Sequence, residues 1–409
     1  MSKFNINLHE AIYSLSDAFD LVGVTHIHHG KRVAYIAAEC GKLLGWKDQQ
    51  LDDLFQAAIL HDCGVAKTAV HARLAQFEWE QDLEHCNEGA WLLSTCPLLN
   101  HLSTIILYHH THWSELIYCD LPEREKLIAN CIFLADRVDV LSLECLLDQS
   151  NLLISQKTVI QKVKEKADDW FSSELIEVFL EVANSSFFWF ALESGDTSSY
   201  TATWKAHAPN REIDYQELKS LVHIFSHIVD AKSHFTKEHS DGVANLARFL
   251  GECFNLPETT CEMLELAGLL HDIGKLRVPD ELLEKPGKLT PEEYEIIQRH
   301  SFDTYDILKN INGLEKITEW ASQHHERVDG NGYPFKMANG AISLEARIIA
   351  VSDVFQALAQ NRPYRKAMNA EAILKILKQL VSTGQLDGQV VACVEKHLND
   401  CFKAALMVM

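Results

Sequence analysis

The segment C-E-M-L-E-L-A-G-L-L-H-D, residues 261–272, decides how the second half of the chain folds. Its apolar side chains recur at the three- and four-residue spacing of a helix, so that Leu266 and Leu270 share one face. The helix ends at the polar pair His271-Asp272. A carboxylate on an otherwise apolar helix is costly to bury unless it is paired or binds a metal ion. The segment therefore predicts a buried helix that brings a histidine and an aspartate to a polar site.

The same pattern occurs in the first half of the chain. Five matches occur in the same order and at nearly constant offsets: His29 with His239, His61-Asp62 with His271-Asp272, His85 with His300, His109-His110 with His324-His325, and Asp136 with Asp353. Ordered matches spread over such distances predict a duplicated domain rather than a short solenoid repeat. A polar, turn-rich stretch separates the copies. We expect one domain at 1–194, a linker at 195–212 and a second domain at 213–409.

Helical periodicity dominates both halves, and alternating strand patterns are scarce. The first helix of the second domain is expected to start at Tyr215, and Thr290 is expected to cap a helix that begins at Pro291. The fold class that these patterns predict is all-α, with two helical bundles in tandem.

Composition excludes several classes of partner. The formal net charge of −21 disfavours binding to a DNA or RNA polymer or to an anionic membrane by broad electrostatics. The N-terminal residues lack the features of a signal peptide, and the most apolar run, residues 187–192, is too short to span a bilayer. The eleven cysteines include no Cys-x-x-Cys pair. These features predict a cytoplasmic protein without membrane contact.

The second half holds five matched imidazoles and two carboxylates, which are His239, His271, His300, His324, His325, Asp272 and Asp353. This inventory is sufficient for two divalent cations if one carboxylate bridges them. Mixed imidazole and carboxylate ligands suit iron, manganese, zinc, nickel or copper better than magnesium or calcium. A site with two metal ions can clamp a phosphoryl group, which makes phosphate ester hydrolysis the chemistry to consider.

Several long motifs in this half appear together and in order. They are H-D-I-G-K at 271–275, K-P-G-K-L-T at 285–290, H-H-E-R-x-D-G-x-G-Y-P at 324–334, and R-I-x-A-x-x-D-x-x-x-A-L at 347–358 followed by R-P-Y-R at 362–365. Residues 213–409 thereby resemble the HD-GYP phosphodiesterases, a branch of the HD superfamily of metal-dependent phosphohydrolases. The resemblance implies hydrolysis of a cyclic dinucleotide, c-di-GMP or 3′3′-cGAMP, to the linear 5′-phosphorylated dinucleotide.

The resemblance also implies roles for individual residues. One ion would be held by His239, His271, Asp272 and Asp353, and the other by Asp272, His300, His324 and His325, so that Asp272 bridges them. Catalysis would depend on Asp272 and on Lys275, which would contact the scissile phosphate or protonate the leaving oxygen. Substrate contacts would come from Arg362, Arg365, Tyr333 and Lys285. Iron or manganese are the expected ions, with nickel or zinc as alternatives.

The chain departs from the family pattern in two respects. Some members have a glutamate four residues before the first ligand histidine that supports a third ion. This chain has Phe235 there, and Glu238 would point away from the ligand face, so we expect a dinuclear site. The first half keeps a full ligand set, namely His29, His61, Asp62, His85, His109, His110 and Asp136, but has Val65 in place of the lysine and neither the Gly-Tyr-Pro loop nor the arginine pair.

Several alternatives stay open at this point. Three roles are open for the first half: a metal-loaded regulatory or dimerisation domain, a second hydrolase with another substrate, or an inert bundle. A homodimer is a further possibility for the whole protein. The whole chain could instead be an HD-type nucleotidase acting on mononucleotides. It could also be a sensor that binds a cyclic dinucleotide without cutting it. The choice between c-di-GMP and 3′3′-cGAMP is not readable from these motifs.

Overall fold

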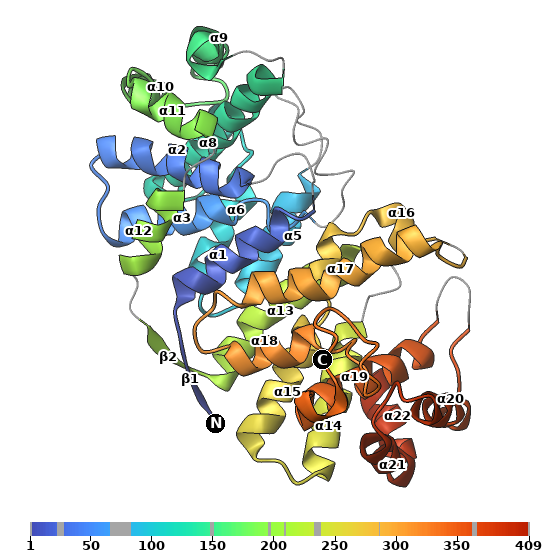
Figure 1. Ribbon diagram of the computed structural model, residues 1–409. Coiled ribbons are helices and arrows are strands. Elements are labelled where there is room, and N and C mark those ends of the chain that lie inside the picture. The colour runs from blue at the N-terminus through green and yellow to red at the C-terminus, as the bar shows by residue number, and fades with distance from the viewer. Residues whose placement is uncertain are drawn as a thin grey trace. The chain divides into compact units, whose positions relative to one another are not determined.

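A computed structural model describes residues 2–22, 28–65, 83–147, 151–194, 198–207, 210–232, 239–285, 287–361 and 366–407 (Figure 1). The chain forms two compact units. The N-terminal unit is Leu8–Pro209, and the C-terminal unit consists of Met1–Asn7 together with Asn210–Met409. The predictions made for Phe235, Glu238, Arg362 and Arg365 lie outside the described residues.

The N-terminal unit is a helical bundle. Helix α2 packs against α3 and α8, and α5 packs against α6. Buried aromatic side chains such as Phe55, Phe179 and Trp189 fill its interior. Its helices are α1 (Leu8–Phe19), α2 (His29–Leu43), α3 (Gln49–Ile59), α5 (Glu84–Ser94), α6 (Ser103–Tyr108), α7 (Trp113–Leu116), α8 (Glu123–Leu147), α9 (Leu152–Lys164), α10 (Ser173–Ala183), α11 (Ser186–Ser194) and α12 (Ser198–His207), with the short 3-10 helix η1 (Asn100–Leu102).

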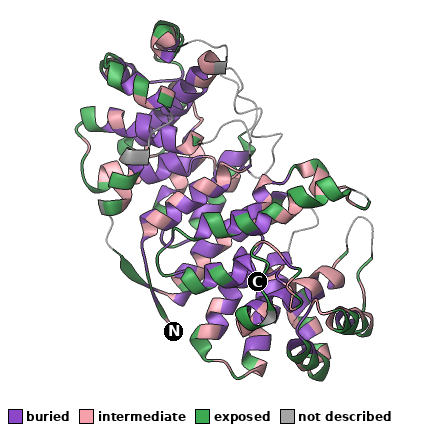
Figure 2. Cartoon of the chain, viewed as in Figure 1, coloured by how far each residue is buried: buried purple, intermediate pink, exposed green. Residues whose placement is uncertain are grey.

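The C-terminal unit is a second bundle, in which α14 packs against α15, α19 and α22. Its elements are β1 (Lys3–Ile6), β2 (Arg211–Asp214), α13 (Tyr215–Lys232), α14 (His239–Cys253), α15 (Glu258–Leu270), η2 (Ile273–Arg277), α16 (Asp280–Leu283), α17 (Pro291–Leu308), α18 (Glu315–Ser322), η3 (Asn339–Ala341), α19 (Leu344–Ala359), α20 (Ala370–Ser382), α21 (Gly388–Lys396) and α22 (Leu398–Leu406). In both units buried residues line the helix faces that pack together, and exposed residues cover the outer faces (Figure 2).

Local signals set several helix ends. The Thr290 side chain accepts a hydrogen bond from the N–H of Glu293, and the Glu293 carboxylate accepts one from the N–H of Thr290. This capping box starts α17 at Pro291, as predicted, and such a cap contributes about 1 kcal/mol. Helix α13 starts at Tyr215, which is also the predicted position. Correct helix starts matter here because α17 carries one of the candidate ligands.

The all-α prediction is confirmed, with two short strands as the exception among the described residues. Strand β1 pairs antiparallel with β2, with Lys3 opposite Asp214 and Ile6 opposite Arg211. The range 195–212, predicted to be a linker, contains helix α12 and part of β2. Since β1 and β2 are paired, the first residues of the chain join the C-terminal unit rather than the bundle that follows them.

No single helix among the described residues is long and apolar enough to cross a membrane. Helices α10 and α11 are long and apolar enough only when they are taken together, and the chain bends by 84° between them.

Candidate metal centres

Seven side chains converge in the C-terminal unit. They come from the start of α14, the end of α15, the middle of α17, the end of α18 and the middle of α19. Each of the seven belongs to at least one group of three or more residues whose candidate ligand atoms lie within 4.8 Å of one another. They are His239, His271, Asp272, His300, His324, His325 and Asp353, which is the set that the sequence predicted.

Asp272 lies at the centre of this cluster. Its Oδ2 atom is 3.6 Å from His239 Nε2 and 3.3 Å from His271 Nε2. Its Oδ1 atom is 3.5 Å from His300 Nε2 and 3.8 Å from His324 Nε2. Each oxygen of one carboxylate therefore faces a different pair of imidazoles, which is the arrangement that a carboxylate bridging two cations requires.

Three imidazoles of the cluster are oriented by their own helices. The Nδ1–H groups of His271, His300 and His324 donate to the carbonyl oxygens of Gly268, Ile297 and Ala321, three residues earlier, at 2.6, 2.5 and 2.7 Å. These hydrogen bonds select the tautomer in which the Nε2 lone pair faces the cluster. Each ring is therefore held ready to act as a metal ligand.

The cluster fits cations on physical grounds. His271 Nε2 and Asp272 Oδ1 are buried and have no hydrogen-bond partner among the described residues, which is costly unless a ligand satisfies them. Burial lowers the pKa of His300 to about 3 and that of His325 to about 4, so both rings are neutral at physiological pH. Burial raises the pKa of Asp272, but His271 and Lys275 outweigh it and hold that pKa well below its usual value. The neutral imidazoles of His300 and His325 and the ionised carboxylate of Asp272 match the ligand state that divalent metals need.

A glycine brings α17 close to the His-Asp pair. A Cβ atom on Gly274 would lie 2.0 Å from the carbonyl oxygen of His300, so no side chain fits there. The N-terminal unit repeats this contact, since a Cβ atom on Gly64 would lie 2.1 Å from the carbonyl oxygen of His85. In both units the small residue after the His-Asp pair allows the helix with the third histidine to approach.

Lys275 lies one turn beyond His271, and its ammonium contacts Asp272 Oδ2. Its side chain is 18% exposed, so it lies at the mouth of the cluster rather than inside the core. Lys285 was predicted to contact substrate, and its ammonium is bound by Glu293 at 2.6 Å. Lys275 thus directly adjoins the predicted ligand Asp272, whereas Lys285 is engaged at the start of α17.

The Gly-Tyr-Pro loop packs over the histidine pair. The Tyr333 ring lies 4.8 Å from the ring of His325, measured between centroids. Glu326 is buried, and its carboxylate accepts hydrogen bonds from the N–H groups of Phe335 and Met337 at 2.7 and 2.9 Å. These contacts fasten the loop, a role for Glu326 that no sequence pattern indicated.

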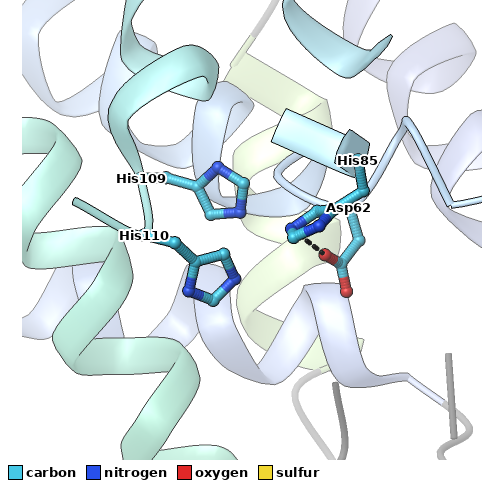
Figure 3. Close-up of side chains that lie close together, drawn as sticks. All are labelled: Asp62, His85, His109 and His110. Carbon is cyan, nitrogen blue, oxygen red and sulfur yellow. Dashed lines mark ion pairs between the residues drawn. The ribbon is translucent and has the colours of Figure 1, made fainter. Parts of the chain in front are cut away.

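A second cluster lies in the N-terminal unit and contains the seven equivalent residues. His29 Nε2 lies 3.3 Å from Asp136 Oδ1 and 3.8 Å from Asp62 Oδ2, and His85 Nε2 lies 3.8 Å from Asp62 Oδ1. Figure 3 shows His85, Asp62 and the pair His109 and His110 facing one another, and one nitrogen or oxygen atom from each of these four lies within 4.8 Å of the others. His29, His61 and Asp136 form another.

The atoms of this second cluster also fit cations. His61 Nε2, His109 Nε2 and Asp62 Oδ1 are buried without a hydrogen-bond partner among the described residues. Burial lowers the pKa of His109 to about 3, and the pKa of Asp62 is lowered to about 2 because neighbouring imidazoles outweigh its burial. Two features differ from the other unit: Val65 replaces the lysine, and Arg137 forms an ion pair with Asp136 at 2.6 Å.

Comparison with known protein families supports two related domains. A family model described as an HD domain matches residues 27–141, and a second model with the same description matches residues 223–390. These ranges contain the two clusters of histidines and aspartates. HD domains are metal-dependent hydrolases, which agrees with the ligand geometry of both.

Individual relatives resemble the chain over different extents. The 3′3′-cGAMP-specific phosphodiesterase 1 of Vibrio cholerae is 36% identical over 409 residues, covering 99% of this chain and 95% of its own length. The cyclic di-GMP phosphodiesterase PA4108 of Pseudomonas aeruginosa is 40% identical over 157 residues, covering 38% of this chain and 37% of its own length. The crystal structure of a cyclic GMP-AMP specific phosphodiesterase of V. cholerae matches with a TM-score of 0.65 and 26% identity, covering 97% of this chain and 98% of the other.

Proposed function

Because the chain belongs to the HD-GYP family of cyclic dinucleotide phosphodiesterases, we propose that its C-terminal unit hydrolyses 3′3′-cGAMP to the linear 5′-phosphorylated dinucleotide. The observation that supports this substrate is the extent of the similarity. The 3′3′-cGAMP-specific relative matches 99% of the chain, including both units, whereas the cyclic di-GMP phosphodiesterase PA4108 matches 38%. Activity on c-di-GMP is the second candidate, since a relative that is 40% identical over 157 residues is a cyclic di-GMP phosphodiesterase.

The proposed cofactors are two divalent cations in the C-terminal unit, iron or manganese first. His239, His271 and Asp353 would hold one ion, His300, His324 and His325 the other, and Asp272 would bridge them. The Oδ1 and Oδ2 contacts of Asp272 support this division. When bound, the ions neutralise charge on the scissile phosphate and make water more acidic.

The proposed roles of Lys275 and Tyr333 follow from their positions. Lys275 carries a proton on Nζ at the mouth of the cluster, where it can protonate the 3′-oxygen as the P–O bond breaks. Tyr333 forms an aromatic wall next to His325, suited to a nucleobase. Arg362 and Arg365 are proposed to bind phosphates on the strength of the family motif alone. A chain with a net charge of −21 needs such local cations to attract an anionic substrate.

For the N-terminal unit we propose a metal-loaded, non-hydrolytic role in regulation or dimerisation. Its seven candidate ligands are brought together as in the other unit, which supports metal binding. The place of Lys275 is taken by Val65, an apolar residue that cannot donate a proton to a leaving oxygen. The same cluster without a proton donor favours binding over turnover.

The test is turnover by purified full-length protein loaded with Mn²⁺ or Fe²⁺. Equal concentrations of 3′3′-cGAMP, c-di-GMP and a panel of mononucleotides are offered, and products are separated by chromatography. We expect hydrolysis of 3′3′-cGAMP with a higher kcat/KM than c-di-GMP. Preferential hydrolysis of mononucleotides would support the nucleotidase alternative. Tight binding without turnover would support the sensor alternative.

A further inference from the structure

The first histidine of each cluster is held by a side chain rather than by its own helix. In the C-terminal unit, Nδ1–H of His239 donates to the amide oxygen of Gln356 at 2.5 Å. The amide nitrogen of Gln356 in turn donates to the carbonyl oxygen of Ala405 at 3.5 Å, which fixes the orientation of the amide. The acceptor that supports His239 is therefore electrically neutral.

In the N-terminal unit, a pair of charged side chains supports the first histidine. Nδ1–H of His29 donates to the carboxylate of Asp139 at 2.7 Å. Asp139 accepts two further hydrogen bonds from the guanidinium of Arg32, at 2.6 and 3.0 Å. Arg32 and Asp139 are both buried, so this pair is part of the interior. The acceptor that supports His29 is an ionised carboxylate held by an arginine.

The positions of the two pairs correspond. Gln356 and Asp139 each lie three residues after the last aspartate of their cluster, and Gly242 and Arg32 each lie three residues after the first histidine. A Cβ atom on Gly242 would lie 2.7 Å from the Gln356 side chain and 2.3 Å from the carbonyl oxygen of Ala405. The C-terminal unit thus has no room for an arginine, and without that arginine a buried carboxylate would be uncompensated.

Two other histidine supports are alike in the two units. His61 and His109 donate Nδ1–H to the carbonyl oxygens of Ala58 and Ile106, three residues earlier. These contacts match those of His271 and His324. The exchange of Arg32 and Asp139 for Gly242 and Gln356 therefore contrasts with these two conserved contacts.

The chemistry of the acceptor determines how strongly an imidazole binds a metal. A carboxylate on Nδ1–H increases the basicity of Nε2 and strengthens its bond to the ion, and changing such a partner alters metal affinity by about 10–100-fold. An amide orients the ring equally well but donates less electron density. A more weakly held ion is also a stronger Lewis acid toward its other ligands.

We propose that Gln356 and Gly242 are positioning residues that make the ion on His239, His271 and Asp353 the weakly held, exchangeable ion of the chain. The ion at the equivalent place in the N-terminal unit is held tightly by Asp139 and Arg32 through His29. The catalytic unit is thereby sensitive to metal availability, whereas the N-terminal unit keeps its metal. This inference rests on the proposed ligand sets of the two units.

The experiment measures the metal bound to the protein rather than the product formed. Full-length protein loaded with Mn²⁺ is equilibrated with increasing concentrations of EDTA, and the manganese retained per chain is measured by mass spectrometry. The variants are Gln356→Glu, which places a carboxylate on His239, and Gln356→Met, which keeps the volume and removes the acceptor. Asp139→Asn is the matched change in the N-terminal unit.

For the wild-type chain we expect one ion to be released before the others. Gln356→Glu moves this first release to about 10-fold higher EDTA and Gln356→Met moves it to lower EDTA, while Asp139→Asn adds a second early release. Release curves within twofold of wild type for both Gln356 variants would overturn the proposal, as would an unchanged curve for Asp139→Asn. A wrong substrate assignment leaves these curves unaffected, so the two failures can be told apart.

Discussion

The two metal clusters of this chain share seven residue types on equivalent elements but differ in what surrounds them. Around the C-terminal cluster, Lys275 contacts the central aspartate and Glu326 fastens a loop over the histidine pair. At the matching positions the N-terminal unit has Val65 and Thr111. The comparison shows that this fold can keep the proposed metal ligands while the residues proposed to handle phosphate are absent. We therefore expect metal binding and turnover to be separable properties of the same bundle.

The largest effect is expected from removing the central carboxylate. Asp272→Ala deletes a side chain that faces both imidazole groups, so both proposed ions are affected. We expect hydrolysis of 3′3′-cGAMP to fall by more than about 1000-fold, beyond the cost of losing one charge-stabilising donor. The matched variant Asp62→Ala removes the equivalent residue and should keep hydrolysis of the same order as the wild-type chain. If Asp62→Ala were as inactive as Asp272→Ala, the separation between the two units would fail.

The next largest effect concerns Lys275. Lys275→Met keeps the length of the side chain but removes the proton, and we expect kcat to fall by about 100-fold or more, as for loss of a general acid. KM should change little, and the manganese content should stay the same, because the ligands remain in place. Val65→Lys provides the reverse test. It should not create activity in a chain that also carries Asp272→Ala, because the loop and the arginine pair are still missing there.

A smaller effect is expected from changing Glu326, which is not one of the proposed metal ligands. Glu326→Ala removes the acceptor for the N–H groups of Phe335 and Met337, so the loop that carries Tyr333 loses its anchor. We expect kcat/KM to fall by about 10-fold, mainly through KM, in the range found for supporting residues. Glu319→Ala, an exposed change on α18, is the control and should behave as wild type. An equal loss in both variants would point to general destabilisation.

The smallest effect is a pH dependence that differs between the units in metal-free protein. The pKa of His300 is lowered to about 3, below its ordinary value of 6.5, so the unfolded chain binds more protons than the folded chain as pH falls from about 6.5. His300 therefore makes the folded state less stable on acidification. Burial lowers the pKa of His29, but Asp136 and Asp139 outweigh it and raise that pKa to about 10. The stability that His29 contributes is present below pH 6.5 and is lost as pH rises toward 10.

Thermal unfolding of two variants checks these signs. His300→Gln should reduce the loss of stability between pH 6.5 and 4 relative to wild type. His29→Gln should reduce the loss between pH 7 and 10. Each kcal/mol changes the unfolding midpoint by about 2–4 °C for units of this size. The same dependence in both variants would contradict the assigned charge states.

The parts of the fold and site that the sequence predicted are those with a local or repeated signal. The start of α17 follows from Thr290 and Pro291, which act within one turn, and the two sets of seven residues were visible because the pattern occurs twice. The structure brings both sets together. Whether each residue binds metal or substrate stays a prediction, including the roles of Arg362 and Arg365.

The features that were missed depend on contacts distant in sequence. The pairing of β1 with β2 joins four residues at the start of the chain to four beyond residue 210, and strands this short carry little pattern. The roles of Gln356 and Asp139 carry no local signal, because their partners His239 and His29 are over a hundred positions away. The available signal was that a polar residue lies three positions after the last aspartate of the set in both copies.

The central claim is that both units bind metal and only the C-terminal unit cuts the substrate. Its most direct test is to measure metal content and 3′3′-cGAMP turnover on the same preparations of wild-type, Asp62→Ala and Asp272→Ala protein. We expect each variant to retain less manganese than wild type, and we expect turnover to disappear with Asp272→Ala and to persist with Asp62→Ala. Full metal content in Asp62→Ala, or persistent turnover in Asp272→Ala, would contradict it.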